Sequence, residues 1–206
     1  MNTTLLKQYY TTASAGYLGA TKTTGSHSHK FLYGAELSKE VKTALQNVFM
    51  PELKKSQVLA KIQTYTGGQH LTFTLKLQKS TYGATLEEYK QTIRERVQQD
   101  KILWVWNEEN GQPVQVFHEK YWDMNAEGKK KIEDITADKM TEYNYYSDGE
   151  NINHHYINED PMLNDRGKEL VKAANEVIRA YNRDDSNAQV DYFDTNFYYD
   201  IKIKWI

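Results

Sequence analysis

Two histidines and a lysine near the N-terminus are the strongest candidates for chemistry in this sequence, within the tetrapeptide His27-Ser28-His29-Lys30. Metal-independent cleavage of RNA uses this combination of side chains. One imidazole removes the 2′-hydroxyl proton, a second protonates the leaving oxygen, and a lysine stabilises the charge of the phosphorane. The same imidazoles would supply only two ligands to a metal ion. His27, His29 and Lys30 are therefore predicted as catalytic residues only if the protein is a nuclease, and the alternative is a flexible polar loop.

A group of carboxylates surrounds the last strand that the sequence predicts: Asp184, Asp185, Asp191, Asp194 and Asp200. Clustered carboxylates can hold Mg²⁺ for phosphoryl chemistry. The alternative is turn chemistry, in which Asp and Asn side chains between residues 182 and 187 hydrogen-bond to the backbone and close a loop after a helix. We favour the turn interpretation, and we expect neither a metal site nor a cofactor.

Lysines dominate the first part of the chain. Residues 1–80 carry ten Lys, three Glu and neither Arg nor Asp, a net charge of +7, whereas residues 81–206 have a net charge of −9. A local excess of lysine provides a sequence-independent surface for phosphates, and tyrosines can stack on bases. The predicted nucleic-acid-binding residues are Lys39, Lys42, Lys54, Lys55, Lys61, Lys76, Lys79, Tyr9, Tyr10 and Tyr17. The alternatives are an ordinary solvated face, or two halves that pack together and partly neutralise each other.

Composition and missing motifs narrow the classes of function. The 206 residues are enough for one domain or two small lobes, and the absence of cysteine excludes disulfides and thiolate metal sites. No apolar stretch approaches the roughly 18 residues that span a bilayer, and the N-terminus lacks the apolar core of a signal peptide, so we expect a cytoplasmic protein without a membrane partner. A Walker loop, a dinucleotide-binding glycine pattern, a zinc-binding helix and a nucleophile elbow are all missing, which argues against a metabolic enzyme.

Hydrophobic periodicity predicts an α+β fold, with helices packed on one face of a mostly antiparallel sheet. Residues 1–34 form a polar N-terminal segment, which we expect to be a loop or tail ordered only by docking. Residues 35–206 are expected to form a single α+β domain. An insertion at about 100–160 contains a hairpin and a polar lobe.

Helical spacing of apolar residues predicts four helices: from Ala35 to just before Pro51, from Leu86 to Val97, around Lys129 to Ile135, and from Glu169 to Tyr181. Thr85 and Glu88 form a capping box at the start of the second helix. Alternation predicts strands over 58–62, 71–77, 102–106, 114–117 and 197–205, with Asn110-Gly111 in the turn of the second hairpin. In the last strand Tyr198, Asp200, Lys202 and Lys204 point away from the core. Trp104 and Trp106 share one face and are expected in a core or interface, and His154-His155 lies in a polar loop.

Two stretches resemble one known family. The first runs from Ala35 through Lys42, Leu45 and Phe49 into the following hairpin. The second is Ala180-Tyr181-Asn182-Arg183-Asp184-Asp185-Ser186 followed by Asp191-Tyr192-Phe193-Asp194 and Phe197-Tyr198. They resemble the opening and closing elements of the large polyvalent protein-associated domains, which are small α+β modules of conjugative plasmids, transposons and phages. The matching motif residues are Asn182, Asp185, Asp191, Tyr192, Phe193 and Asp194. The blocks cover about half of the chain and lie further apart than the family pattern expects.

The resemblance implies a protein of a mobile genetic element in a bacterial host. Free-standing proteins of this kind often counter host defence, and this chain is similar in size and style to anti-CRISPR proteins that block the type II RNA-guided nuclease. The expected function is therefore inhibition, by binding the host CRISPR effector nuclease or its guide RNA, with a homo-oligomer as a further possibility. Two alternatives stay open: a small metal-independent ribonuclease acting on guide RNA, and a plasmid accessory protein that binds nucleic acid.

Overall fold

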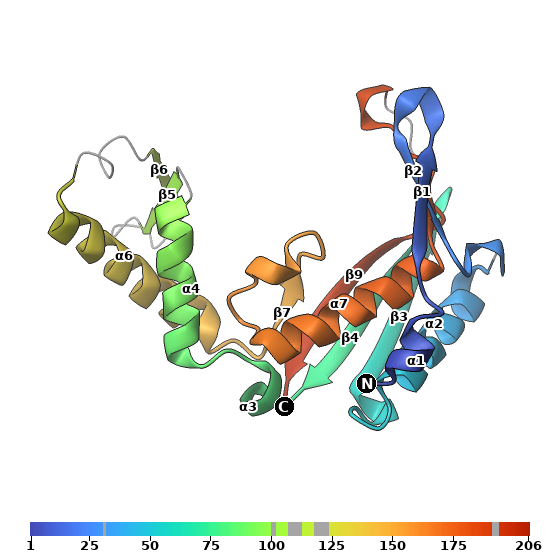
Figure 1. The fold of residues 1–206 in the computed structure, drawn as a ribbon, viewed down its shortest axis with the longest axis horizontal. Coiled ribbons are helices and arrows are strands. Elements are labelled where there is room, and N and C mark those ends of the chain that lie inside the picture. The colour runs from blue at the N-terminus through green and yellow to red at the C-terminus, as the bar shows by residue number, and fades with distance from the viewer. Residues whose placement is uncertain (31, 100–101, 107–112, 118–123, 191–193) are drawn as a thin grey trace.

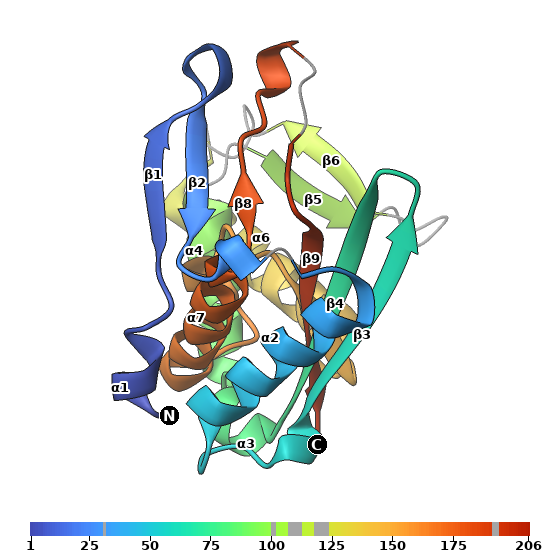
Figure 2. The ribbon, with the colours of Figure 1, turned by 90° about the vertical axis from the view of Figure 1, so that its right-hand side faces the viewer.

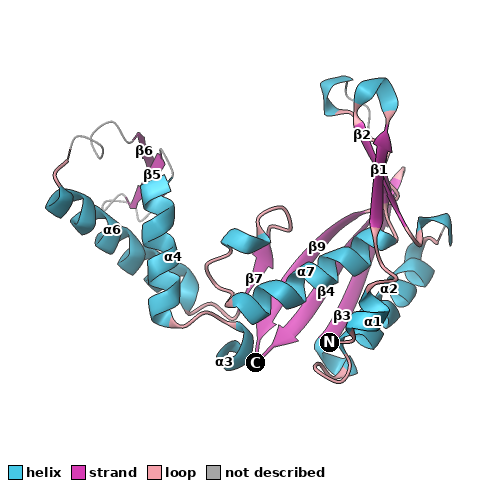
Figure 3. Ribbon diagram, viewed as in Figure 1, coloured by secondary structure: helices cyan, strands magenta, loops and turns pink. Residues whose placement is uncertain are grey.

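The computed structural model describes residues 1–30, 32–99, 102–106, 113–117, 124–190 and 194–206 (Figure 1). The described chain combines helices with mostly antiparallel sheets, so the predicted α+β class is confirmed (Figure 3). The helices are α1 (Thr3–Leu6), α2 (Gly34–Phe49), α3 (Lys79–Tyr82), α4 (Leu86–Gln99), α6 (Ala126–Met140) and α7 (Asp165–Ala180). The strands are β1 (Thr11–Ala15), β2 (Thr21–Gly25), β3 (Val58–Tyr65), β4 (Gly68–Leu77), β5 (Ile102–Trp106), β6 (Pro113–Phe117), β7 (Gly149–Ile152), β8 (Arg183–Asp184) and β9 (Tyr198–Trp205).

The central sheet has four strands in the order β3-β4-β9-β7. Strands β3 and β4 are antiparallel, as are β7 and β9, whereas β4 and β9 run parallel. A three-stranded antiparallel sheet has the order β1-β2-β8, and β5 pairs with β6 alone. The sheets are therefore mostly antiparallel, as predicted. The parallel pair joins two strands that lie more than a hundred residues apart in the sequence.

The hairpin of β3 and β4 sets the pattern of the central sheet. Its turn is Thr66-Gly67, where Gly67 has a φ of +85°, a conformation that other residues adopt only with strain. Alternate residues of β4, from Gln69 to Leu77, are buried. The residues between them face the other way and remain partly exposed. One face of the sheet therefore belongs to the core.

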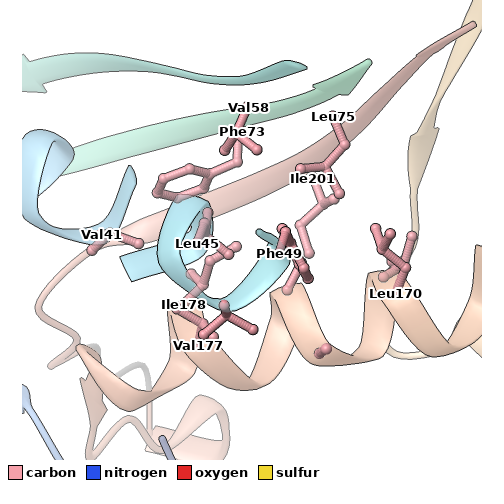
Figure 4. Close-up of a cluster of buried hydrophobic side chains, with 14 of the residues drawn as sticks. Val41, Leu45, Phe49, Val58, Phe73, Leu75, Leu170, Val177, Ile178 and Ile201 are labelled. Atoms are coloured by element: carbon pink, nitrogen blue, oxygen red, sulfur yellow. The ribbon is translucent and has the colours of Figure 1, made fainter. Parts of the chain in front are cut away.

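Helices α2 and α7 cover that buried face (Figure 2). Apolar residues at helical spacing, such as Val41 and Leu45 of α2 and Val177 of α7, pack on Phe73 and Ile201 of the sheet (Figure 4). Each of these five side chains is fully buried. This arrangement confirms the expectation that the helices pack on one face. On the opposite face the side chains of β3, β4 and β9 are half-buried or exposed, and we call it the open face.

The N-terminal segment differs from the expected loop or tail. It contains α1 and the hairpin of β1 and β2, and β2 pairs with β8 after the last helix. The backbone amides of Gly25 and His27 donate to the carbonyls of Asn182 and Ala180, at distances of 2.8 and 2.7 Å. Strand β1 is exposed along its whole length, so it has no apolar alternation that could have revealed it in the sequence.

The described residues between 86 and 145 form a lobe that stands apart from the central sheet in Figure 1. Helices α4 and α6 pack against each other around Tyr89, Ile93 and Ala137, and we call this part the α4–α6 lobe. The predicted capping box is confirmed, since the Thr85 amide donates to Glu88 Oε2 at 2.7 Å and the Glu88 amide donates to Thr85 Oγ1 at 3.3 Å. The β5–β6 hairpin is also confirmed. Its turn at Asn110-Gly111 and the side chains of Trp104 and Trp106 lie outside the described residues.

Two helices are longer than the periodicity predicts, because asparagine caps extend them. Asn125 Oδ1 accepts from the Gly128 amide before α6, and Asn164 Oδ1 accepts from the Gly167 amide before α7, each at 2.9 Å. At Gly167 an added Cβ would lie 2.2 Å from the Tyr82 carbonyl oxygen. This glycine therefore allows α7 to pack closely against α3. None of the described helices has the length and apolar character needed to cross a membrane.

Candidate nucleic-acid interface

The open face of the central sheet brings together lysines from three strands. Lys61 of β3, Lys76 of β4, and Lys202 and Lys204 of β9 all point away from the buried face. The strands are about 4.8 Å apart and same-face residues on one strand are about 7 Å apart. These four side chains therefore share one continuous surface.

Lys76 and Lys204 are direct cross-strand partners in the parallel pair of β4 and β9. Like charges in this position repel and destabilise a sheet. Within the described part of the chain, no ion pair neutralises Lys61, Lys76, Lys202 or Lys204. Their repulsion would be relieved by a bound anion, such as the phosphates of a polynucleotide.

One carboxylate stands among the outward residues of the described strands β3, β4, β7 and β9. It is Asp200, which lies 2.9 Å from His70 Nε2 through its Oδ2 atom. The sequence prediction that Asp200 faces away from the core is confirmed, because about half of its side chain is exposed. Since the described lysines outnumber this single carboxylate, the open face is strongly positive although the whole chain has a net charge of −2.

Tyrosines occupy the other end of the open face, near the turn between β3 and β4. Tyr33, Tyr65 and Tyr198 have exposed fractions of 56, 45 and 46%. The Tyr65 ring lies over Gly68, where an added Cβ would come within 2.8 Å of the ring, and the Tyr33 hydroxyl donates to the Gly68 carbonyl at 3.3 Å. Tyr198 is the cross-strand partner of His70. Three of the four lysines, Lys76, Lys202 and Lys204, thus lie towards the end of the sheet surface opposite the aromatic rings, and Lys61 lies between.

The other lysines predicted to bind nucleic acid lie elsewhere. Lys39 and Lys42 are on α2, in the layer of helices behind the sheet, and Lys54 and Lys55 are exposed in the segment between α2 and β3. Lys79 turns inward from α3. Its ammonium group donates to the Tyr145 carbonyl and lies 4.0 Å from the centre of the Tyr145 ring, and burial lowers the pKa of Lys79. Of the seven lysines, only Lys61 and Lys76 are outward residues of the sheet.

The three predicted tyrosines are on the N-terminal segment, away from the open face. Tyr10 and Tyr17 are exposed, whereas Tyr9 is half-buried. The Tyr9 ring stacks on His27 with 4.8 Å between ring centres, and His27 lies 5.1 Å from Tyr181. Sequence reasoning did not assign Lys202, Lys204, Tyr65 or Tyr198 to the interface. Alternation of apolar and polar residues in the predicted strands indicates in which direction these side chains point. It does not show which strands are neighbours in the sheet.

His27 is a packed residue rather than a free imidazole. The Ser26 hydroxyl donates its proton to the Gln8 carbonyl, so the 2.9 Å contact between Ser26 Oγ and His27 Nδ1 is donated by the histidine. Burial between the two tyrosines lowers the pKa of His27 and keeps its ring neutral at pH 7. The cavity beside this ring measures about 10 Å³, which is enough for one water molecule and not for a nucleotide.

The other two members of the histidine motif are exposed, and His29 is not among the residues that line that cavity. Lys30 forms an ion pair with Glu40 at 2.6 Å, and its ammonium lies 5.6 Å from the Tyr181 ring centre. The lysine is therefore already neutralised by a carboxylate. This geometry fits the attachment of the N-terminal segment to α2 and α7 better than it fits acid–base catalysis.

Asp184 makes the turn interaction that we favoured, whereas the other described carboxylates of this group contact residues further away in the sequence. Asp184 Oδ1 accepts from the Ser186 amide at 3.0 Å, and Asp185 Oδ1 accepts from the Tyr17 amide at 2.9 Å. Asp194 pairs with Arg183 at 2.9 Å. Asn182 donates from Nδ2 to the Phe197 carbonyl at 3.0 Å, which joins the end of α7 to the start of β9. Asp191, Tyr192 and Phe193 lie outside the described residues, and among the described ones no three metal-binding side chains converge.

A buried ionisable group at the base of the α4–α6 lobe gave no signal in the sequence. Glu150 of β7 points into the protein, and its Oε1 atom has no hydrogen-bond partner among the residues that the structure describes. Burial, followed by the nearby carboxyl of Asp160, raises the pKa of Glu150 to about 9, and Lys79 opposes this effect. Glu150 therefore holds a proton at pH 7. The His154-His155 pair that the sequence offered makes a packing contact: the His154 ring stacks on Tyr199, with 4.7 Å between the ring centres.

We compared the chain with protein-family models, curated proteins and solved structures, and none of them matches it.

Proposed function

We propose that this protein binds nucleic acid through the open face of its central sheet, and that it thereby inhibits a host nuclease guided by RNA. The supporting observation is the cluster of lysines that form no ion pair with any described residue, above all the directly opposed Lys76 and Lys204. Clustered cations of this kind attract phosphates independently of base sequence. The guide RNA of a type II nuclease is the target that the mobile-element resemblance suggests.

Binding alone is enough for such an inhibitor. A guide RNA whose phosphates lie against the lysines is no longer available to the positively charged channel of the nuclease. A second contact with the nuclease itself would use the acidic, tyrosine-rich part of the chain. There, Tyr143, Tyr146 and Tyr156 are exposed, and tyrosine is enriched at protein interfaces.

The ribonuclease alternative has less support. It needs two histidines with access to one phosphodiester, whereas His27 is packed between Tyr9 and Tyr181 and Lys30 is paired with Glu40. The plasmid accessory alternative shares the lysine surface and differs in its ligand. It would bind duplex DNA with strong salt dependence and would leave every defence system unaffected.

The test combines purified protein with guide RNA, with and without the type II nuclease, followed by a denaturing gel and a DNA-cleavage assay. We expect intact RNA and blocked cleavage. The variant K76Q/K204Q should lose this block, whereas K39Q/K42Q, which removes the same charge from the layer of helices, should keep it. Shortened RNA would support the ribonuclease, and normal cleavage with intact RNA would refute inhibition.

A further inference from the structure

The open face has two chemically different ends. Lys76, Lys202 and Lys204 mark one end, and Tyr65 and Tyr198 mark the other. Tyr198 and Lys204 are six residues apart on β9, so about 20 Å separates them along the strand. A ligand that uses both ends must therefore be extended, anionic and equipped with flat groups.

Between the two ends lie the pair of His70 and Asp200 and one lysine, Lys61, whose neighbours across the strands are Thr72 and then Asp200. Gln63 and Thr72 offer hydrogen bonds on this part of the face. Asp200 would repel a phosphate placed directly above it, because its carboxylate is half exposed. A base is better suited to this position, since base edges carry N–H donors that a carboxylate accepts.

The tyrosines distinguish between forms of nucleic acid. Tyr65 and Tyr198 expose nearly half of their surface on the open face. In a duplex the faces of the bases are stacked on each other and unavailable. In a single strand the bases can turn outward and stack on aromatic side chains. A surface with lysines alone would suit either form, but adjoining tyrosines favour the single strand.

We infer that the open face binds a single-stranded polynucleotide segment of about four nucleotides, with bases stacked on Tyr65 and Tyr198 and phosphates held by Lys61, Lys76, Lys202 and Lys204. This inference rests on the proposed function and names its ligand. RNA and DNA share the chemistry that the face recognises, namely extended phosphates and unstacked bases. The length follows from the span of about 20 Å and lies at the low end of the range for single-stranded sites.

The inference is tested with fluorescein-labelled probes in an anisotropy titration. The probes are an eight-nucleotide RNA, the DNA of the same sequence, and a 20-base-pair duplex, all at 100 mM salt. We expect tighter binding of the single strands than of the duplex. Comparison of the RNA probe with the DNA probe of the same sequence shows which of the two nucleic acids the open face prefers.

Substitution of the tyrosines sharpens the test. Y65A/Y198A should weaken single-strand binding by roughly 25-fold or more, because each stacked base contributes at least about a fivefold effect. Duplex binding should stay unchanged. Y10A/Y17A removes two exposed tyrosines from the N-terminal segment and should have no effect. Since Tyr65 also covers Gly68, Y198A alone and Y65F/Y198F are included, and the phenylalanine pair should bind as the wild type does.

Two failures can be told apart. If the duplex binds as tightly as the single strands, or Y65A/Y198A binds them normally, the inference is wrong while the proposed function stands. If no probe binds and K76Q/K204Q is indistinguishable from the wild type, the proposed function is wrong as well. Selective loss of single-strand binding in Y65A/Y198A and Y198A supports the inference.

Discussion

Removing the opposed lysines of the central sheet should change how binding depends on salt. In the variant K76Q/K204Q, two of the four cations on the open face are neutral. For single strands, the logarithm of the binding constant falls with the logarithm of salt concentration, with a slope of about −0.7 for each phosphate that is neutralised. If Lys61, Lys76, Lys202 and Lys204 each neutralise one phosphate, the wild-type slope is about −2.8 and the variant slope about −1.4.

These slopes translate into measurable affinities. Between 50 and 200 mM salt, wild-type affinity for the eight-nucleotide RNA should fall by about 50-fold, whereas that of the variant should fall by only about sevenfold. The assay is an anisotropy titration at four salt concentrations between these limits. The control K39Q/K42Q carries the same change in net charge on α2. It should keep the wild-type slope.

The same variant should also be more stable, since it removes a like-charge pair that lies directly across two strands. We expect a gain of up to about 1 kcal/mol in the free energy of unfolding, measured in urea at low salt. Weaker binding in a more stable protein would separate loss of a ligand contact from loss of the fold. An unchanged salt slope, or an equal change in K39Q/K42Q, would refute the assignment of the open face.

Three further predictions follow from buried and paired groups. Glu150→Gln should stabilise the protein by roughly 1–3 kcal/mol at pH 8 and hardly at all at pH 4.5. Folding raises the pKa of this carboxyl to about 9, so the wild-type protein loses stability as the pH rises from 4.5 to 9, and the glutamine variant does not. Urea unfolding at several pH values measures the difference. Asp194→Asn should cost at most about 1 kcal/mol, since its partner Arg183 is partly exposed, and thermal unfolding measures this loss. The double variant His27→Ala with His29→Ala should still inhibit DNA cleavage, and loss of inhibition in a folded variant would revive the nuclease interpretation.

Local patterns were enough to predict most of the central fold. Alternation in β4 and β9 gave both strands and the direction of their side chains, because one face of each is buried and the other is not. The helices α2 and α4 followed from apolar spacing, and the capping box of α4 from Thr85 and Glu88. The hairpin β1–β2 escaped prediction because an exposed strand of small polar residues has no such pattern.

The site was harder to predict because it depends on neighbours in space. Lys61 and Lys76 were identified from composition, and Lys202 was known to point outward, but no local pattern shows that β4 and β9 are adjacent and parallel. Lys79 belongs to the same run of lysines, yet the chain leaves the sheet at Gln78 and directs this side chain to Tyr145. Strand pairing over long distances therefore decided which charges meet.

The position of the α4–α6 lobe gives the lysine end of the sheet a second role. The chain leaves β4 one residue after Leu77 and returns through β7, where Gly149 is the cross-strand partner of Lys204. Both connections to the lobe thus lie at the end of the sheet that carries Lys76 and Lys204 (Figure 1). A polynucleotide held there would run towards the lobe rather than away from it. In a complex of RNA and protein, the RNA would occupy the open face while the exposed tyrosines that follow α6 would contact the protein that carries it. In the proposed complex, the insertion that separates the two family-like blocks would therefore face the partner, while the open face would hold the phosphates.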